Sequence, residues 1–205
     1  MAPPVLYRVI YGTTTPYDYQ KALTTVRPAL LQSYHRHKVK HADYQAILPH
    51  ENGASVRGSL VTGLLDEDMR RLDIFEGDQY ERKKVKVLVL KDTSLDEVID
   101  EDDLGSITVG EAEAETYVWI DPREDLEEEE WDFEEFRREK MWAWVGEAER
   151  PWNAQNGGAD GVVVDEGFAD VDRDVAERER ERKNDPTGGR GVNGKITKEL
   201  ERAAV

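Results

Sequence analysis

The sequence contains no cysteine, and this absence limits the chemistry that the chain can perform. Without a thiol there is no disulfide, no thiolate metal site and no cysteine nucleophile. Long apolar runs are also missing: no stretch approaches the roughly 20 apolar residues of a membrane helix, and the first residues lack the apolar core of a signal peptide. We therefore expect a soluble, cytoplasmic protein without a membrane partner.

Positive charge is scarce in the middle of the chain. Residues 91–150 contain 23 acidic and 6 basic side chains, whereas residues 1–90 contain 10 acidic and 13 basic ones. The whole chain has a formal net charge of −17, so the middle segment accounts for the imbalance. A strongly acidic surface repels the phosphate backbone, and we therefore expect no nucleic-acid partner.

The composition predicts one folded domain followed by a tail. Hydrophobic residues make up 38% of the 205 residues and charged residues 36%, which is typical of a chain with an unfolded part. We place the domain at residues 1–150. Residues 151–205 are charged and rich in glycine, and we expect them to be mostly disordered, with the ERERER stretch as a solvated helix.

Short helical and extended patterns alternate along the domain. The segment Val5–Tyr11 fits either a strand or a short helix, and residues 94–110 read as an acidic loop. Helices are predicted at 17–25, 66–76 and 126–147, and strands at 33–41, 46–48, 56–64, 81–90 and 115–120. The mixture predicts an α+β fold built around a small, closed or strongly curved sheet.

The predicted helix that begins at Asp66 carries a carboxylate on its apolar side. At about 100° per residue, Leu65, Met69, Leu72 and Glu76 lie on one side of this helix. One interpretation is a solvated glutamate at a helix end. The other is a half-buried carboxyl whose pKa is raised by desolvation, which is suited to accepting and returning a proton near neutral pH.

Four segments, in this order, resemble the γ-glutamylcyclotransferase-like family, and in particular its avirulence-induced-gene branch in plants and fungi: VRGSLVTGL, LLDEDMRRLDIFEGDQYERKKVKV, ETYVWI and WDFEEFRREKM. The resemblance covers about residues 1–150. It implies a small mixed β-barrel with flanking helices and an enzyme that needs neither a metal nor a cofactor. The family's catalytic glutamate, in its E-G pair, corresponds to Glu76.

The reaction that this resemblance implies is an intramolecular aminolysis of a small γ-glutamyl compound. The free α-amine attacks its own γ-carbonyl, which gives 5-oxoproline and releases an amine or amino acid. One carboxyl can accept the first proton and return it to the leaving nitrogen. Tyr80 and Arg82 match the family's Y-x-R. In one interpretation Tyr80 forms a pocket wall and Arg82 orients Glu76. In the simpler one Tyr80 is an aromatic residue at a strand start and Arg82 a surface charge. Asp73 is interpreted as structural.

The position of the family's substrate loop, a strand followed by Y-G-[ST]-x, is open. Tyr11 and Gly12, followed by two threonines, match it in one placement. In the other, which we favour, MAPPVL at residues 1–6 matches the segment just after the loop. The chain is then a shortened form with an exposed sheet edge, and we expect weak catalysis that an upstream strand and loop would restore. The rival hypothesis is a catalytically impaired binding or regulatory module.

Two other groups of residues are weaker candidates. His35 and His37 have a spacing compatible with metal binding on a strand, but no third ligand lies at a useful spacing, so we predict no metal site. The tryptophans of residues 131–144 are interpreted as core residues rather than a ligand cage. The oligomeric state is left open.

Overall fold

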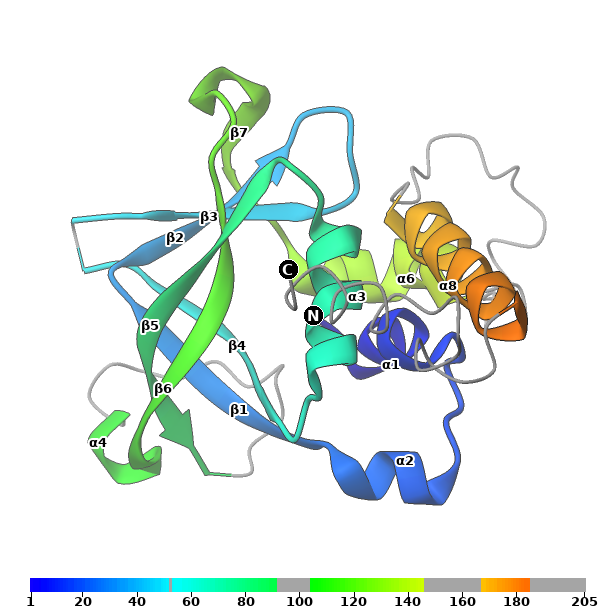
Figure 1. Ribbon diagram of the computed structural model, residues 1–205. Coiled ribbons are helices and arrows are strands. Elements are labelled where there is room, and N and C mark those ends of the chain that lie inside the picture. Colours follow the sequence, from blue (N-terminus) through cyan, green and yellow to red (C-terminus); the bar gives the residue numbers. More distant parts are fainter. Residues whose placement is uncertain (52, 92–103, 146–166, 185–205) are drawn as a thin grey trace, which may run out of the picture. The chain divides into compact units, whose positions relative to one another are not determined.

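The computed structural model describes residues 1–51, 53–91, 104–145 and 167–184 (Figure 1). The chain divides into two compact units, Met1–Gly167 and Phe168–Val205. The strands are β1 Thr25–Gln32, β2 Tyr34–Val39, β3 Gln45–Pro49, β4 Ser55–Thr62, β5 Tyr80–Leu90, β6 Thr108–Trp119 and β7 Leu126–Glu130. The helices are α1 Pro3–Tyr11, α2 Asp18–Leu23, α3 Asp66–Glu76, α4 Leu104–Ile107, the 3-10 turn η2 Arg123–Asp125, α5 Phe133–Glu135, the π-helical turn η3 Phe136–Lys140, α6 Met141–Val145 and α8 Gly167–Asn184.

The described strands form two antiparallel sheets, flanked by helices (Figure 1). One sheet has the order β4-β1-β5-β6 and the other β3-β2-β7. The longest ladder joins β5 to β6, from Tyr80 opposite Trp119 to Leu90 opposite Thr108. The predicted α+β class with flanking helices is therefore confirmed.

Two apolar clusters join the two sheets. In the first, Trp119 of β6 packs with residues of the smaller sheet and the turns beside it, namely Val39, Ala42, Ala46 and Leu126. In the second, Ile47 of β3 packs against Ala29, Leu31 and Val87 of the larger sheet. Because each cluster draws side chains from both sheets, burial of apolar area holds the sheets together.

Strand β1 has no counterpart among the strands predicted from the sequence. It contains Pro28, which cannot donate a hydrogen bond to a neighbouring strand, and proline within a run argues against a central strand. In the structure β1 lies between β4 and β5, but β5 pairs only with Ala29 and Leu30. The proline therefore lies just outside the ladder with β5, and the strand forms despite it.

The first segment is a helix, which decides between the two interpretations of Val5–Tyr11. Pro3 occupies the first turn of α1, where its missing N–H is not needed. Val9 and Ile10 are fully buried, and the carbonyl oxygen of Ile10 accepts a hydrogen bond of 2.6 Å from Nη1 of Arg71 in α3. Helix α1 is thereby fixed against α3.

Helix α3 begins as predicted, but its buried side differs from the predicted stripe. Leu65 has extended backbone angles (φ −90°, ψ 164°) and is the N-cap residue, with its N–H donating to Asp68 Oδ2 at 2.9 Å. Leu65 precedes the helix and is 62% exposed, so it is not part of the buried side. The buried side is formed by Asp68, Leu72 and Phe75.

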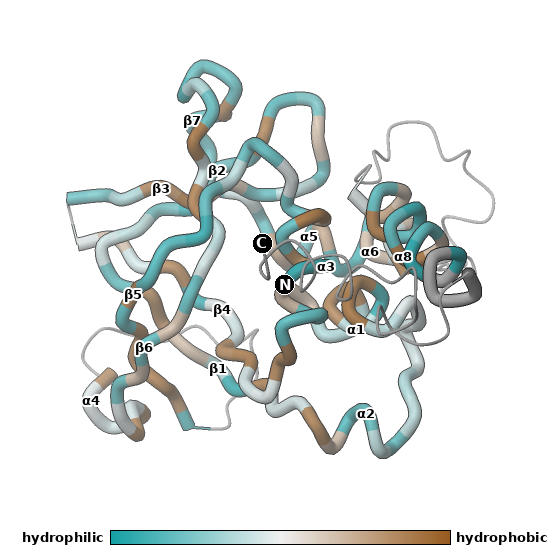
Figure 2. Tube along the Cα trace, in the orientation of Figure 1, coloured by the Kyte–Doolittle hydropathy of each residue, from teal (hydrophilic) through white to brown (hydrophobic). Residues whose placement is uncertain are grey.

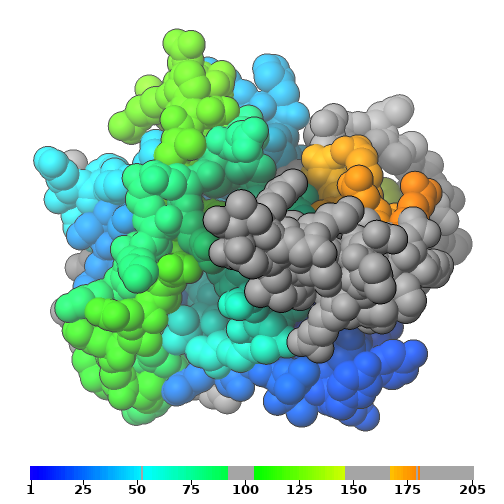
Figure 3. Space-filling model, in the orientation of Figure 1, coloured from blue at the N-terminus to red at the C-terminus, as the bar shows by residue number. Residues whose placement is uncertain are grey.

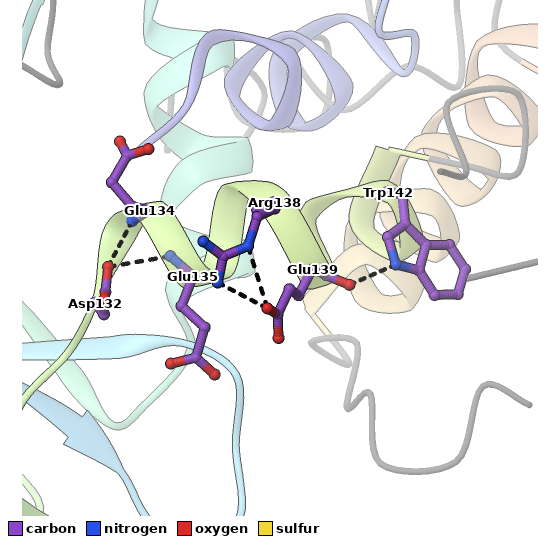
Figure 4. Close-up of polar contacts among 6 residues, drawn as sticks. All are labelled: Asp132, Glu134, Glu135, Arg138, Glu139 and Trp142. Atoms are coloured by element: carbon purple, nitrogen blue, oxygen red, sulfur yellow. Dashed lines mark hydrogen bonds and ion pairs between the residues drawn. The ribbon is translucent and has the colours of Figure 1, made fainter. Parts of the chain in front are cut away.

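The helix predicted from residue 126 begins seven residues later. Residues 126–130 are the strand β7, which pairs with β2 through Glu130 opposite His37 and Leu126 opposite Val39. Glutamate runs favour helix, and here pairing with β2 overrides that preference. The helical segment starts after Asp132, whose carboxylate accepts hydrogen bonds from the N–H groups of Glu134 and Glu135 at 2.8 and 3.0 Å (Figure 4).

Aromatic rings fill the space between this helical segment and α3. Phe136 and Trp144 meet edge to face at 5.3 Å, Trp131 lies 5.2 Å from Phe136, and Phe75 of α3 contacts Trp144 at 6.4 Å. The Nε1–H of Trp142 donates to the carbonyl oxygen of Glu139 (Figure 4). The tryptophans are buried, in line with the sequence interpretation, and two of them, Trp131 and Trp144, also line a cavity.

The acidic regions lie partly within the described residues. Of the predicted loop 94–110, residues 104–107 form α4, β6 starts at Thr108, and residues 94–103 lie outside the description. The turn before β7 is hydrophilic along most of its length (Figure 2), and this segment projects from the surface at the top of Figure 3. Four consecutive glutamates of β7 follow that turn.

The second unit is described only by α8. This helix contains the ERERER stretch, which confirms a helix there, and it begins earlier, at Gly167. Ion pairs one turn apart support it, between Arg173 and Asp170 at 2.8 Å and between Arg178 and Asp174 at 3.6 Å. Within the described part of the chain, no helix is long and apolar enough to cross a membrane.

We predict that the Leu72→Ala substitution lowers the free energy of unfolding by about 2–5 kcal/mol, because it removes a buried side chain between α3 and its neighbours. The matched control is Leu65→Ala, whose exposed side chain should change that free energy by less than about 0.5 kcal/mol. Urea denaturation followed by circular dichroism measures both. Equal losses in the two variants would contradict the burial of one face of α3.

Candidate active site

A cavity of about 740 Å³ lies between the two sheets and α3. Its lining includes Glu76 from the end of α3, Tyr80 from β5, Tyr117 from β6 and Arg36 from β2. Most of the remaining lining is apolar, including Trp131 and several aliphatic residues of β1 and β5. A largely apolar cavity with a few converging polar groups is typical of a small-molecule site.

Glu76 reaches this cavity because α3 ends abruptly after it. Gly77 has φ 68° and ψ −166°, a combination that is open essentially to glycine alone. Its N–H still donates to the carbonyl oxygen of Asp73 at 3.2 Å, so the last turn of the helix is closed before the chain turns away. The pair Glu76-Gly77 thus places a half-buried carboxylate at the end of a helix, facing the cavity wall.

Tyr117 and Asp73 connect α3 to β6 beside Glu76. The hydroxyl of Tyr117 donates to Asp73 Oδ1 at 2.7 Å. Arg82 Nε lies 3.4 Å from the same Asp73 oxygen, and its Nη1 lies 3.2 Å from Glu115 Oε2. Burial, the hydrogen bond to Asp73 and the nearby Glu76 all raise the pKa of Tyr117, so its phenol stays neutral.

Tyr80 and Arg82, predicted from the Y-x-R pattern, lie at different places. Tyr80 lines the cavity, and its hydroxyl donates to the carbonyl oxygen of Gln45 in β3 at 2.8 Å while its ring meets Trp119 edge to face at 5.2 Å. Arg82 makes its ion pair on α3 with Asp73, at 3.4 Å from Oδ1, although the sequence had suggested a contact with Glu76. Tyr80 is therefore a fixed part of the cavity wall, and Asp73 contacts both Tyr117 and Arg82.

Arg36 was not among the residues predicted for the site. Its Nη2 donates to the carbonyl oxygen of Arg57 in β4, and its guanidinium lies 5.7 Å from the ring centroid of Trp131. Burial lowers the pKa of Arg36, and the charge of Glu130 opposes that shift. The strand alternation of residues 34–39 could have placed Arg36 on the side opposite His35 and His37, but not in a cavity.

A family model described as gamma-glutamyl cyclotransferase, AIG2-like, matches residues 9–137. The chain belongs to this family. AIG2-like protein B of Arabidopsis thaliana is 34% identical over 167 residues, which are 77% of this chain and 87% of that protein. Protein AIG2 B of the same plant is 39% identical over 114 residues, which are 56% of this chain and 57% of that protein.

The match to the curated AIG2 proteins is partial in length. This AIG2-like chain spans a little over half of the length of the first of them, with 57%, 56% and 54% of those proteins covered. A solution structure of an Arabidopsis thaliana protein is 26% identical, with 93% of this chain and 82% of that chain covered at a TM-score of 0.42.

Tyr11 and Gly12, one of the two possible matches to the family's substrate loop, lie outside the cavity. Gly12 ends α1 with φ 71°, and its N–H donates to the carbonyl oxygen of Arg8 at 2.9 Å. The hydroxyl of Tyr11 donates to the carbonyl oxygen of Gln20 at 3.1 Å. In this AIG2-like chain a helix precedes them instead of a strand, and neither residue lines the cavity that contains Glu76.

The histidines form a ring cluster on the other side of β2. His35 and His37 have ring centroids 4.6 Å apart, and His50 lies 5.5 Å from His35. Nδ1 of His37 lies 3.1 Å from the carbonyl oxygen of Glu127, in a position to donate, and burial lowers the pKa of His37. Within residues 1–51, 53–91, 104–145 and 167–184, no group of three or more His, Cys, Asp or Glu is arranged to hold a metal ion.

We predict that Asp73→Asn lowers the pKa of Tyr117, because the substitution removes a negative charge and leaves the positive Arg82 beside the phenol. The measurement is an NMR pH titration of ¹³C-labelled tyrosine, with the resonance assigned through Tyr117→Phe. Asp66→Asn, at the opposite end of α3, is the matched control and should leave the titration unchanged. An unchanged titration of Tyr117 in Asp73→Asn would contradict the influence of Asp73 on the pKa of this phenol.

Proposed function

We propose that the chain is a γ-glutamylcyclotransferase that converts a small γ-glutamyl compound into 5-oxoproline and a free amine. The proposal is supported by membership of the family together with one observation, the position of Glu76. This carboxylate stands at the end of α3 and lines a cavity with a mostly apolar wall. A volume of about 740 Å³ lies within the range of sites that enclose small ligands.

In the proposed reaction Glu76 acts first as a base and then as an acid. Its carboxylate accepts a proton from the α-amine of the γ-glutamyl group while the amine nitrogen forms a bond to the γ-carbonyl carbon. The carboxyl then donates that proton to the leaving nitrogen as the original amide bond breaks. One carboxyl thus takes up and returns the same proton. Because the attacking amine and the carbonyl belong to one molecule, they are already close together and no second substrate is needed.

The surroundings of Glu76 favour this role. The neighbouring Tyr117 keeps its proton, because burial and Asp73 raise its pKa. The phenol therefore adds no negative charge next to Glu76. The Tyr117 hydrogen bond also ties the last turn of α3 to β6, so the carboxylate is presented by elements with fixed backbones rather than by a loop.

A second candidate is a binding module that keeps the fold and Glu76 without turnover. The observation that favours it is the position of Tyr11 and Gly12, which do not line the cavity. The backbone N–H groups of Tyr11 and Gly12 therefore do not stabilise negative charge that develops on a γ-carbonyl in this cavity, and such stabilisation is commonly a large part of acyl-transfer catalysis. This module would bind γ-glutamyl compounds or 5-oxoproline but release no product.

We predict that Glu76→Gln lowers kcat for 5-oxoproline release by about 10²- to 10⁴-fold, because the amide cannot take up the proton of the attacking amine. The assay follows 5-oxoproline by chromatography with γ-glutamyl amines, γ-glutamyl amino acids and glutathione as substrates. Glu67→Gln is the matched control: it lies on the same helix, 3.7 Å from Nε of Arg71, outside the cavity lining, and should retain activity.

The outcomes separate the two candidates. Turnover by the unmodified chain that Glu76→Gln abolishes supports the enzyme. Undiminished turnover in that variant would remove Glu76 from the reaction. Binding of 5-oxoproline with no turnover of any of the three substrate classes would favour the binding module.

A further inference from the structure

The cavity that holds Glu76 also holds a fixed positive charge. Arg36 extends from β2 into the lining, where the carbonyl oxygen of Arg57 accepts a hydrogen bond from its Nη2 and the ring of Trp131 lies beneath its guanidinium. Two other basic residues line the cavity. Lys84 is exposed to solvent, and the backbone of Arg57 provides the carbonyl oxygen that holds Arg36. Arg36 is held in one place by two contacts from different elements, and neither contact neutralises its charge.

The guanidinium has hydrogen-bonding capacity left over. Its Nε is buried and has no hydrogen-bond partner among the described residues. No carboxylate in that part of the chain comes within ion-pair distance of it, and the charge of Glu130 acts on it only from farther away. A half-buried arginine without an acidic partner is unfavourable for stability, and five N–H donors in a planar fork match a carboxylate.

Arg36 and Glu76 line the same cavity, and Met1 lines it with them. Burial and the charge of Arg36 lower the pKa of the Met1 amino group, and the charge of Glu76 raises it. The lining therefore contributes one positive and one negative side chain to a single cavity.

We propose that Arg36 binds the α-carboxylate of the γ-glutamyl group while Glu76 faces its α-amine. This inference rests on the proposed function and deepens it. The α-amine and the α-carboxylate are attached to the same carbon, so an amino-acid head group brings opposite charges into the cavity a few bonds apart. The positive Arg36 meets the α-carboxylate and the negative Glu76 meets the α-amine, and this arrangement orients the amine toward the base.

The alternative target of Arg36 would be a carboxylate on the leaving group. The α-carboxylate is favoured because it is rigidly linked to the nitrogen that Glu76 must deprotonate, whereas a leaving group lies beyond the γ-carbonyl, three carbons along the chain. Every γ-glutamyl compound carries the α-carboxylate, including those that release a simple amine. The assignment therefore predicts one substrate class, γ-glutamyl compounds with a free α-carboxylate, irrespective of the leaving group.

The test compares substrates that differ in one carboxylate. The first is a γ-glutamyl amine and the second is the 4-aminobutyryl amide of the same amine, which lacks only the α-carboxylate and cyclises to 2-pyrrolidinone. We expect Arg36→Gln to raise KM for the γ-glutamyl amine by about 10- to 100-fold, the range of one charge-assisted contact, with a smaller change in kcat. For the 4-aminobutyryl amide, the same variant should change KM by less than about 2-fold, because no charge-assisted contact is lost.

Two further variants separate binding from folding. Arg36→Lys keeps the charge but loses the fork, and it should restore part of the lost affinity. Lys38→Gln removes one positive charge from the same strand outside the cavity, where Lys38 lies 3.5 Å from Glu127, and it should leave both substrates unaffected. Equal impairment of both substrates by Arg36→Gln would show a structural role and overturn the assignment.

A leaving-group contact has its own signature. If Arg36→Gln impairs γ-glutamyl amino acids and spares γ-glutamyl amines, the positive charge binds the leaving group and the α-carboxylate assignment is wrong. If both are impaired to the same degree and the 4-aminobutyryl amide is spared, the assignment holds.

A binding measurement distinguishes failure of this inference from failure of the proposed function. Chemical-shift titrations with 5-oxoproline and with 2-pyrrolidinone require no turnover. Arg36-dependent binding of 5-oxoproline alone, in a chain without turnover, would leave the carboxylate contact in place and remove the enzyme activity. Turnover by the unmodified chain, together with 5-oxoproline binding that is unchanged in Arg36→Gln, would support the enzyme activity and overturn the carboxylate contact.

Discussion

The candidate site depends on the way α3 stops at Glu76. Gly77 takes backbone angles that other residues avoid, so the helix ends without a further turn and β5 begins three residues later at Tyr80. From that junction the helix is tied to β6 through Asp73 and Tyr117, and β5 is tied to β3 through the Tyr80 hydroxyl. One tight turn therefore brings a carboxylate and both sheets to the same cavity.

The charged residues near the cavity differ in how far other side chains balance their charge. Asp73 has two polar partners, Tyr117 and Arg82, and these contacts hold α3 in place. Arg36 lines the cavity and keeps unused donor capacity, because its contacts are a carbonyl oxygen and an aromatic ring rather than a carboxylate. Among the described residues the structure thus separates a satisfied network, which holds α3, from a positive group that is available to a ligand.

Much of this arrangement could be predicted from residues close in sequence, and the rest depended on contacts between distant segments. Glu76 stood out because its helix and the following glycine are local features. Strand β1 was missed because Pro28 indicates a break in a strand. In the structure β5 pairs only with Ala29 and Leu30, which follow the proline, so Pro28 does not interrupt that pairing. Strand β7 was read as helix because pairing with β2, nearly 90 residues earlier, outweighs the preference of its glutamates. Arg36 could not be assigned for the same reason, since its partners lie in β4 and at Trp131.

The proposed pairing of Arg36 with a carboxylate and Glu76 with an amine has a consequence for product release. The substrate carries a basic α-amine, but ring closure converts that nitrogen into an amide of 5-oxoproline, which no longer attracts a carboxylate. The α-carboxylate is unchanged by the reaction, so the contact with Arg36 persists in the product while the contact with Glu76 is lost. Of the two side chains that orient the substrate, only Arg36 still holds the product. The part of the binding free energy that depends on the amine is lost in the chemical step, which favours release of the product.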